Sequence, residues 1–193
     1  MKRHRRGIVL VVTLAVVATA AVLFLRPLND APLGGPPIEG QVQNFALAEG
    51  RGAGPVTPWR DSQGGLVRLA DFQGKVVMVN FWATWCAPCI RELPSIDRLQ
   101  AELSGGDFTV VAVNIDKGGK SIAGPFAERL GLRNLDLYLD AQSALARAVR
   151  VTVMPTTIIY DRQGQERGRL EGGAEWDTPE ALALLRWFIQ DQS

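Results

Sequence analysis

Apolar and polar residues alternate along this chain in blocks that predict strands and helices in turn. Two continuous apolar runs, 76–82 and 108–115, are typical of strands buried on both faces of a parallel sheet. Between them, large apolar residues recur every three or four positions over 93–103, which predicts an amphipathic helix that Gly105-Gly106 ends. This strand–helix–strand order indicates a right-handed crossover.

Weaker patterns on either side predict further elements of an α/β domain. The helix after 178 has two candidate N-caps, Asp177 and Thr178, ahead of Pro179. In chain order we expect a hairpin at 59–69, helices at 125–130 and 141–149 with a strand at 135–139 between them, strands at 156–160 and 168–171 joined by a turn at 161–164, and the last helix.

The N-terminus carries an uncharged apolar run of nineteen residues, 7–25. At about 1.5 Å per residue it is long enough to cross a bilayer. Four lysines and arginines precede it and Arg26 alone follows closely, which predicts a cytoplasmic N-terminus with the rest of the chain outside. A cleaved signal peptide is the alternative, because 18–20 has the small-x-small form. We expect an uncleaved anchor, since the apolar run continues past that point.

These patterns divide the chain into three parts. Residues 1–26 are a basic tip and transmembrane anchor, 27–42 a proline- and glycine-rich linker that we expect to be extended, and 43–193 a single domain. Removing the five basic residues up to Arg26 leaves 21 − 5 = 16 basic against 20 acidic residues, a net charge of −4. With no basic patch, nucleic acid is not an expected partner.

Both cysteines of the chain, Cys86 and Cys89, stand directly after the first apolar run. If Cys86 begins a helix, Cys89 lies one turn on, about 5–6 Å away and within disulfide reach. The helix N-terminus would also lower the pKa of the Cys86 thiol. This spacing predicts a redox dithiol in which Cys86 attacks and Cys89 resolves.

Other uses of a cysteine pair fit the composition less well. A zinc site needs four ligands, but there is no third cysteine and the only histidine is His4. Covalent haem attachment needs histidine where Ile90 stands. A purely structural disulfide remains possible, although so short a loop removes little chain entropy. Met154 could add a sulfur ligand for copper(I), yet we expect no metal site and no cofactor beyond the Cys86–Cys89 disulfide.

Four motifs occur together in this chain: Trp-Cys-Ala-Pro-Cys, Arg-Glu-Leu-Pro, Val-Asn-Ile-Asp and Met-Pro-Thr. In this combination, over residues 43–190, the chain resembles the thioredoxin superfamily and within it the TlpA-like branch of membrane-anchored periplasmic thiol:disulfide interchange proteins. The resemblance implies a thioredoxin-like fold, with a central mixed sheet flanked by helices. It also implies a helix–strand insert within 117–150 and a domain in the periplasm of a bacterium, anchored in the inner membrane.

The resemblance assigns roles to two residues beyond the cysteines. Pro155 would be cis and face the dithiol, which leaves the Met154 backbone free to pair with an extended substrate; an ordinary strand-edge proline is the alternative. Glu92 stands where this branch carries a glutamate and would take the proton of Cys89; a solvated helix glutamate is the alternative. Typical thioredoxins have an aspartate where this chain has Asn80, which cannot titrate.

Two further residues beside the cysteines are expected at the site. Trp85 would shield the thiolate and form part of the docking surface together with Met154. Pro88 would restrain the active-site turn, since its ring fixes the backbone and removes one N–H donor.

The function implied by the resemblance is reduction of protein disulfides outside the cytoplasm, with electrons from a transmembrane donor. The expected substrates are cytochrome oxidase assembly factors with copper-binding cysteines, either a copper metallochaperone or an oxidase subunit. One alternative is reduction of apocytochrome c thiols in cytochrome c maturation. An alternative of another class is a copper(I) chaperone or a non-catalytic binding module.

Overall fold

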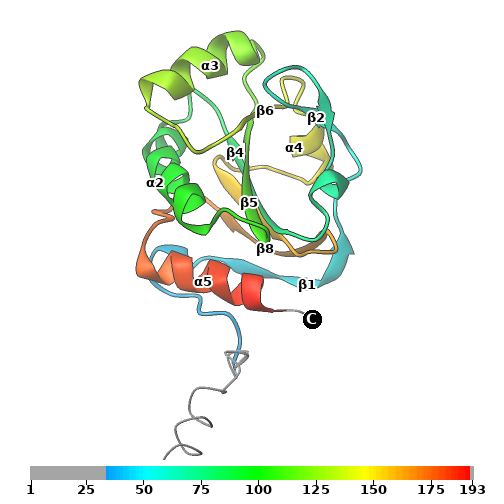
Figure 1. The fold of residues 1–193 in the computed structure, drawn as a ribbon, viewed down its shortest axis with the longest axis vertical. Helices are drawn as coiled ribbons and strands as arrows, with labels where there is room; N and C mark the ends of the chain where they lie inside the picture. The colour runs from blue at the N-terminus through cyan, green and yellow to red at the C-terminus, as the bar shows by residue number, and fades with distance from the viewer. Residues whose placement is uncertain (1–33, 192–193) are drawn as a thin grey trace, which may run out of the picture. The chain divides into compact units, whose positions relative to one another are not determined.

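The computed structural model describes residues 34–191, which build one eight-stranded sheet with helices packed on it (Figure 1). The strands are β1 (Ala46–Ala53), β2 (Trp59–Arg60), β3 (Leu66–Val67), β4 (Val76–Trp82), β5 (Phe108–Asn114), β6 (Leu137–Leu139), β7 (Thr156–Tyr160) and β8 (Gln165–Glu171). The helices are η1 (Gly40–Val42), η2 (Leu69–Phe72), α2 (Ala87–Leu103), α3 (Lys120–Arg129), α4 (Ala144–Ala148) and α5 (Pro179–Gln190).

The sheet is mixed and its order is β1-β8-β7-β4-β5-β6-β2-β3. Strands β4, β5 and β6 run parallel, and the other neighbouring pairs are antiparallel. Phe81 of β4 lies opposite Thr156 of β7, and Trp82 lies opposite Asn114 of β5. The segments that follow β4 and β5 and the one that precedes β7 therefore meet at one end of the sheet.

Alternation along β4 explains how the sheet is covered on both sides. Val76 and Met78 point to one face and pack with residues of α2 and α5, while Val77 and Val79 point to the other and pack with α4. A third buried cluster lies where α2 begins and includes Ala123 of α3. The thioredoxin-like α/β fold with a central mixed sheet is thus confirmed.

Most predicted elements are present, with shifted ends. The strands expected at 76–82 and 156–160 have those bounds, the β2–β3 hairpin forms, and Thr178 rather than Asp177 caps α5. The helix expected at 125–130 begins earlier, at Lys120, because Gly119 adopts the positive φ that starts its first turn. A helix and a strand, α3 and β6, lie within 117–150, the segment of the expected insert.

Two regions differ from expectation at the N-terminal side of the domain. Strand β1 was not predicted, since its glycines and alanines have low strand propensity, and it forms by pairing with β8. Ile38 and Val42 were assigned to the extended linker, but Val42 is fully buried in the core and Ile38 packs against it. Their apolar side chains extend the packed part of the domain a few residues towards the N-terminus.

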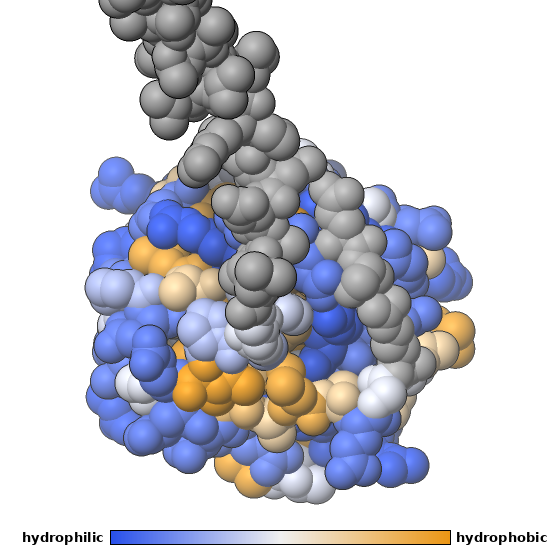
Figure 2. Space-filling view, turned by 90° about the horizontal axis from the view of Figure 1, so that it is seen from below, coloured by the Kyte–Doolittle hydropathy of each residue, from blue (hydrophilic) through white to orange (hydrophobic). Residues whose placement is uncertain are grey.

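The expected anchor at 7–25 lies outside the described residues. Among residues 34–191, no helix is long and apolar enough to cross a membrane. Figure 2 shows the molecule from below relative to Figure 1. On this face, apolar residues form several separate groups between hydrophilic ones.

The connection from α3 to β6 depends on one carboxylate of α2. Asp97 Oδ1 accepts hydrogen bonds from the backbone N–H groups of Arg133, Asn134 and Leu135 at 2.9, 2.8 and 3.1 Å. We predict that Asp97→Ala lowers the free energy of unfolding by about 2–4 kcal/mol, because three backbone N–H groups lose one buried, charged acceptor. Urea unfolding of the disulfide form measures this. Asp97→Asn, which keeps one acceptor oxygen, should lose less, and equal small losses for both variants would contradict the assignment.

Candidate active site

The two cysteines lie at the N-terminus of α2, directly beyond the end of β4. Cys86 is the N-cap residue and forms a disulfide with Cys89. Their Cα atoms are 5.3 Å apart, within the range expected from the helical spacing. Cys86 is 5 % exposed and Cys89 is 0 % exposed, so only Cys86 presents surface to solvent. The site is closed more tightly than the sequence suggested, but the order of accessibility is the expected one.

The N-terminus of α2 places a backbone N–H and the positive end of the helix dipole at the Cys86 sulfur. The Cys89 backbone N–H donates to Cys86 Sγ at 3.3 Å. Pro88, in the first turn, has no N–H to offer. In the dithiol form, this N–H and the helix dipole favour a thiolate at Cys86 over one at Cys89.

A buried aspartate holds the loop that leads from β4 to Cys86. Asp116 accepts hydrogen bonds from the backbone N–H of Thr84 at 2.9 Å and from its hydroxyl at 3.2 Å, and a further one from Asn114 Nδ2 at 2.7 Å. The sequence analysis did not assign these residues a role. The signal was available, because a polar Asn-x-Asp ends a buried parallel strand next to the one that leads to the cysteines.

Glu92 is buried, so the alternative of a solvated helix glutamate is wrong. Its side chain is 2 % exposed and lies one turn beyond Cys89 on α2. Asn80 Nδ2 of β4 donates to Oε1 at 2.8 Å, and the Ala174 backbone N–H donates to Oε2 at 3.1 Å. The carboxyl group thus joins the sheet, α2 and the loop after β8.

Burial dominates the acid–base properties of Glu92. Desolvation raises the pKa of Glu92 to about 7 from its usual 4.5, against the hydrogen bonds from Asn80 and Ala174 and the nearby Trp176 indole, which lower it. The negative charge of Glu175 raises the pKa slightly further. A group with this pKa can both accept and release a proton near neutral pH.

The loop that follows β8 connects Glu92 with the start of β7. The Gly172 N–H donates to the Pro155 carbonyl at 2.8 Å, and the Trp176 N–H donates to Ser95 Oγ on α2 at 3.0 Å. The Met154–Pro155 bond is cis, as the resemblance implied. Pro155 is buried at the end of the sheet where the cysteines lie.

Trp85 and Met154, both expected to contact substrates, differ from each other in exposure. Trp85 is 66 % exposed and is the only aromatic among the exposed large apolar side chains of residues 34–191. Met154 is partly buried and packs against the cluster that contains both cysteines. Trp85 is therefore available to a partner, and Met154 packs against the buried cluster to which the cysteines belong.

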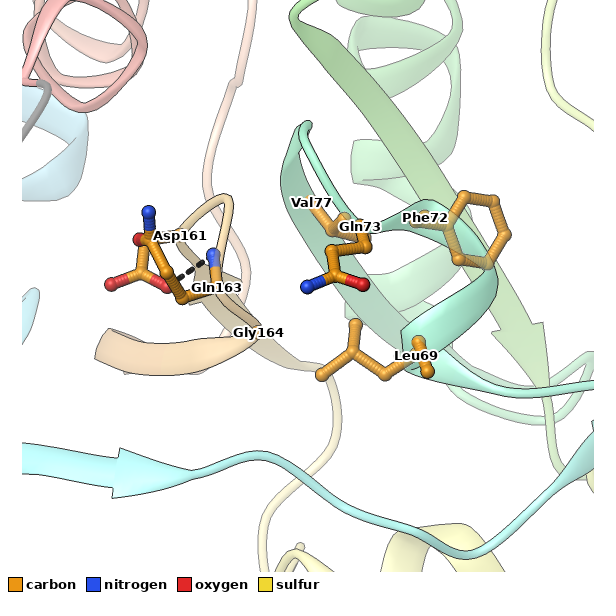
Figure 3. Close-up of a pocket in the computed structure, with 8 residues that line it drawn as sticks. Leu69, Phe72, Gln73, Val77, Asp161, Gln163 and Gly164 are labelled. Carbon is orange, nitrogen blue, oxygen red and sulfur yellow. Dashed lines mark hydrogen bonds between the residues drawn. The ribbon is translucent and has the colours of Figure 1, made fainter.

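One pocket adjoins the site and another lies away from it. One, of about 190 Å³, gives Glu92 an outlet on the side of α2, and its other lining residues are Gln41, Pro88, Arg91, Gly173, Ala174 and Glu175. The other, of about 130 Å³, lies between η2 and the β7–β8 turn, where Leu69 and Gln73 face Gln163 and Gly164 (Figure 3). Neither the cysteines nor Glu92 nor Pro155 lines the second pocket. Within residues 34–191, no three His, Cys, Asp or Glu side chains are grouped to hold a metal ion.

Comparison with known proteins agrees with this geometry. The model of the AhpC/TSA family matches residues 38–167. The chain belongs to this family. The matched range covers β1 to β7, both cysteines, Glu92 and Pro155, so all the site residues described so far except the loop after β8 lie inside the family match.

Similar proteins are thiol-disulfide oxidoreductases by name. The chain is 36 % identical over 112 residues to thiol-disulfide oxidoreductase ResA of Geobacillus kaustophilus, covering 58 % of this chain and 63 % of the relative. The chain is 31 % identical over 120 residues to ResA of Bacillus subtilis, and this match covers 62 % of this chain and 65 % of the relative. The chain thus spans a little under two thirds of these relatives.

A solved structure extends the comparison to a larger part of the chain. The crystal structure of a putative thiol:disulfide interchange protein DsbE from Chlorobium tepidum superposes with a TM-score of 0.61 at 29 % identity. The match covers 74 % of this chain and 96 % of that one.

The raised pKa of Glu92 makes stability depend on pH. The folded protein holds the Glu92 proton more tightly than the unfolded chain, so this stabilisation is complete below about pH 4.5 and is lost as the pH rises through about 7. We predict that stability differs by about 3 kcal/mol between the two ends of this pH range, and that the difference is absent in Glu92→Gln because the amide does not titrate. Urea unfolding of the disulfide form across this range, wild type against Glu92→Gln, measures the difference; parallel pH curves for the two proteins would contradict it.

Proposed function

We propose that the protein is a thiol-disulfide oxidoreductase that reduces disulfides in other proteins. The observation that carries the proposal is the Cys86–Cys89 disulfide at a helix N-terminus with a buried carboxyl group, Glu92, one turn further on. A structural disulfide needs neither the buried acid nor an exposed tryptophan beside it. The names of the relatives, thiol-disulfide oxidoreductases ResA, support the same activity.

The first step is attack by the Cys86 thiolate on a substrate disulfide. A bond forms between Cys86 Sγ and one substrate sulfur, and the other substrate sulfur leaves as a thiolate that takes a proton from water. Cys86 is suited to this step because it is the accessible cysteine and its Sγ receives the Cys89 N–H.

The second step resolves the mixed disulfide. Glu92 accepts the Cys89 proton, and the Cys89 thiolate attacks Cys86 Sγ, which expels the second substrate thiol and closes the protein disulfide. Residues three apart on a helix are about 5–6 Å apart at Cβ, so one water molecule can carry the proton between them. The pocket lined by Glu92 and Arg91 then offers the proton a way to solvent while substrate still covers Cys86.

Substrate docking is proposed at the end of the sheet. An extended substrate segment would pair with the Met154 backbone, and Trp85 would pack against its side chains. Copper-binding cysteine pairs of cytochrome oxidase assembly factors are the substrates we propose first. The apolar segment 7–25 would anchor the domain on the periplasmic side of the inner membrane, where a transmembrane donor returns two electrons to the disulfide.

The assignment of the two cysteines is tested with matched serine variants. We predict that Cys86→Ser abolishes reduction of a disulfide peptide, whereas Cys89→Ser forms a mixed disulfide through Cys86 that persists. In the reduced wild type, iodoacetamide near neutral pH should modify Cys86 at least about tenfold faster than Cys89. Mass spectrometry of the trapped and alkylated proteins measures both.

The outcomes separate the competing functions. A Cys86→Ser protein that still traps peptide through Cys89 would contradict the order of attack. Retained copper(I) binding with no peptide reduction by the wild type would favour a metal chaperone. Presenting Cys89→Ser with an oxidised copper-site peptide and an oxidised haem-binding peptide identifies the substrate class, since faster trapping of the second would move the assignment to apocytochrome c.

A further inference from the structure

Asn80 has an unusual position for a polar residue. It stands in the middle of the apolar strand β4, is 0 % exposed, and lies opposite Thr157 in the sheet. Its Nδ2 donates to Glu92 Oε1 at 2.8 Å and to Thr157 Oγ1 at 3.0 Å. Its Oδ1 is buried and has no hydrogen-bond partner among the described residues. Buried amide oxygens normally have partners, so this arrangement needs a physical reason.

The two hydrogen bonds that Glu92 receives from Asn80 and Ala174 both suit its ionised state. Oε1 receives an N–H from Asn80 and Oε2 receives an N–H from Ala174, so both oxygens face donors. An ionised carboxylate is satisfied by this, because it only accepts. A protonated Glu92 has an O–H to donate and meets a donor on either side. The Ala174 N–H belongs to the backbone and cannot become an acceptor.

We propose that Asn80 is a positioning residue whose side-chain amide turns over when Glu92 gains or loses its proton. After a half-turn about Cβ–Cγ, Oδ1 occupies the place of Nδ2 and accepts the hydrogen of protonated Glu92. Thr157 follows without moving, because its hydroxyl accepts from Nδ2 in one state and donates to Oδ1 in the other. The carboxyl group therefore keeps one position throughout the thiol–disulfide cycle.

This inference rests on the proposed function, in which Glu92 accepts the proton of Cys89. It adds the reason for asparagine at this position. An aspartate at 80 would place a second carboxylate against Glu92, and the two would share a proton rather than pass it on. An apolar residue would leave ionised Glu92 without a donor on the sheet side. The asparagine amide can serve as donor through Nδ2 and as acceptor through Oδ1 without carrying a charge in either state.

Other charged and titratable groups near Glu92 are accounted for. On α2 these are Cys86, Cys89 and Arg91, and the loop after β8 contributes Glu175. The strands β4 and β7 contribute Asn80 and Thr157, neither of which ionises. In the disulfide form the cysteines do not titrate, so that form isolates the exchange between Glu92 and Asn80.

The test follows the Asn80 side chain by NMR in the disulfide form of the full chain. The Asn80 amide and the Glu92 carboxyl carbon should titrate with one midpoint, and contacts between the Asn80 amide protons and the Thr157 side chain should be present above it and lost below it. The Asn114 amide is the internal control, because its acceptor is Asp116, and it should not follow that midpoint. Contacts unchanged across the titration would overturn the proposal.

Two variants test the same point through energetics. Asn80→Leu should raise the Glu92 midpoint by about one pH unit or more, since the carboxylate loses a donor. Thr157→Val, which keeps that donor, should raise it less. A destabilised Asn80→Leu protein with an unchanged midpoint would mean that Asn80 is structural only. If Asn80→Leu does not fold, the wild-type contacts and Thr157→Val decide.

The proposed function can fail separately from this inference. If Glu92→Gln exchanges disulfides at the wild-type rate, Glu92 is not the proton acceptor, and the titration of Asn80 with Glu92 is unaffected by that result. If Glu92→Gln slows exchange but the Asn80 contacts never change, the function stands and the turning amide is wrong.

Discussion

The arrangement of the site depends on one buried carboxyl group. Glu92 receives hydrogen bonds from β4 through Asn80 and from the loop after β8 through Ala174, while its own backbone belongs to α2. Removing this group from water is costly, and that cost appears as a pKa near 7. The same contacts set the position of α2 relative to the sheet, so they also determine where Cys86 and Cys89 lie.

The sheet register brings the remaining parts of the site to the same place. Because β7 runs antiparallel to β4, its first residue lies beside the last residues of β4, and Pro155 arrives next to the cysteine loop. The parallel neighbour β5 delivers Asp116 to the same end, where it holds Thr84. Strands from distant parts of the chain thus converge on one helix N-terminus.

The sequence was most informative where a single pattern decides the structure. The apolar run 76–82 gave β4 its correct bounds, the strand predicted at 156–160 before a turn matches β7, and the cysteine spacing located the start of α2. Strand β1 could not be read from its glycines and alanines, because pairing with β8 rather than propensity forms it. The beginning of α3 was missed because Pro125 resembles a first-turn proline, whereas the helix begins at Lys120 with Gly119 as its N-cap.

Burial of the site polar groups was only partly visible in the sequence. Glu92 precedes Ile96 by four residues and Leu99 by seven, a spacing that places it on the apolar face of α2. This signal of burial was overlooked because glutamate is usually exposed. Asn80 interrupts an apolar strand and could be read as buried, but its partners come from residues 92 and 157 and emerge only from the fold. The contacts of the loop after β8 with Glu92 and Ser95 are likewise tertiary, since no local pattern precedes them.

The most direct test of the account is the pH dependence of the resolving step. Reduced protein is mixed with a disulfide peptide, and release of the second peptide thiol is followed by rapid quench for the wild type and for Glu92→Gln. The account predicts that the wild-type rate rises through a midpoint near pH 7, where Glu92 ionises, and that Glu92→Gln is slower and needs higher pH. Identical rates and pH profiles for the two proteins would contradict it.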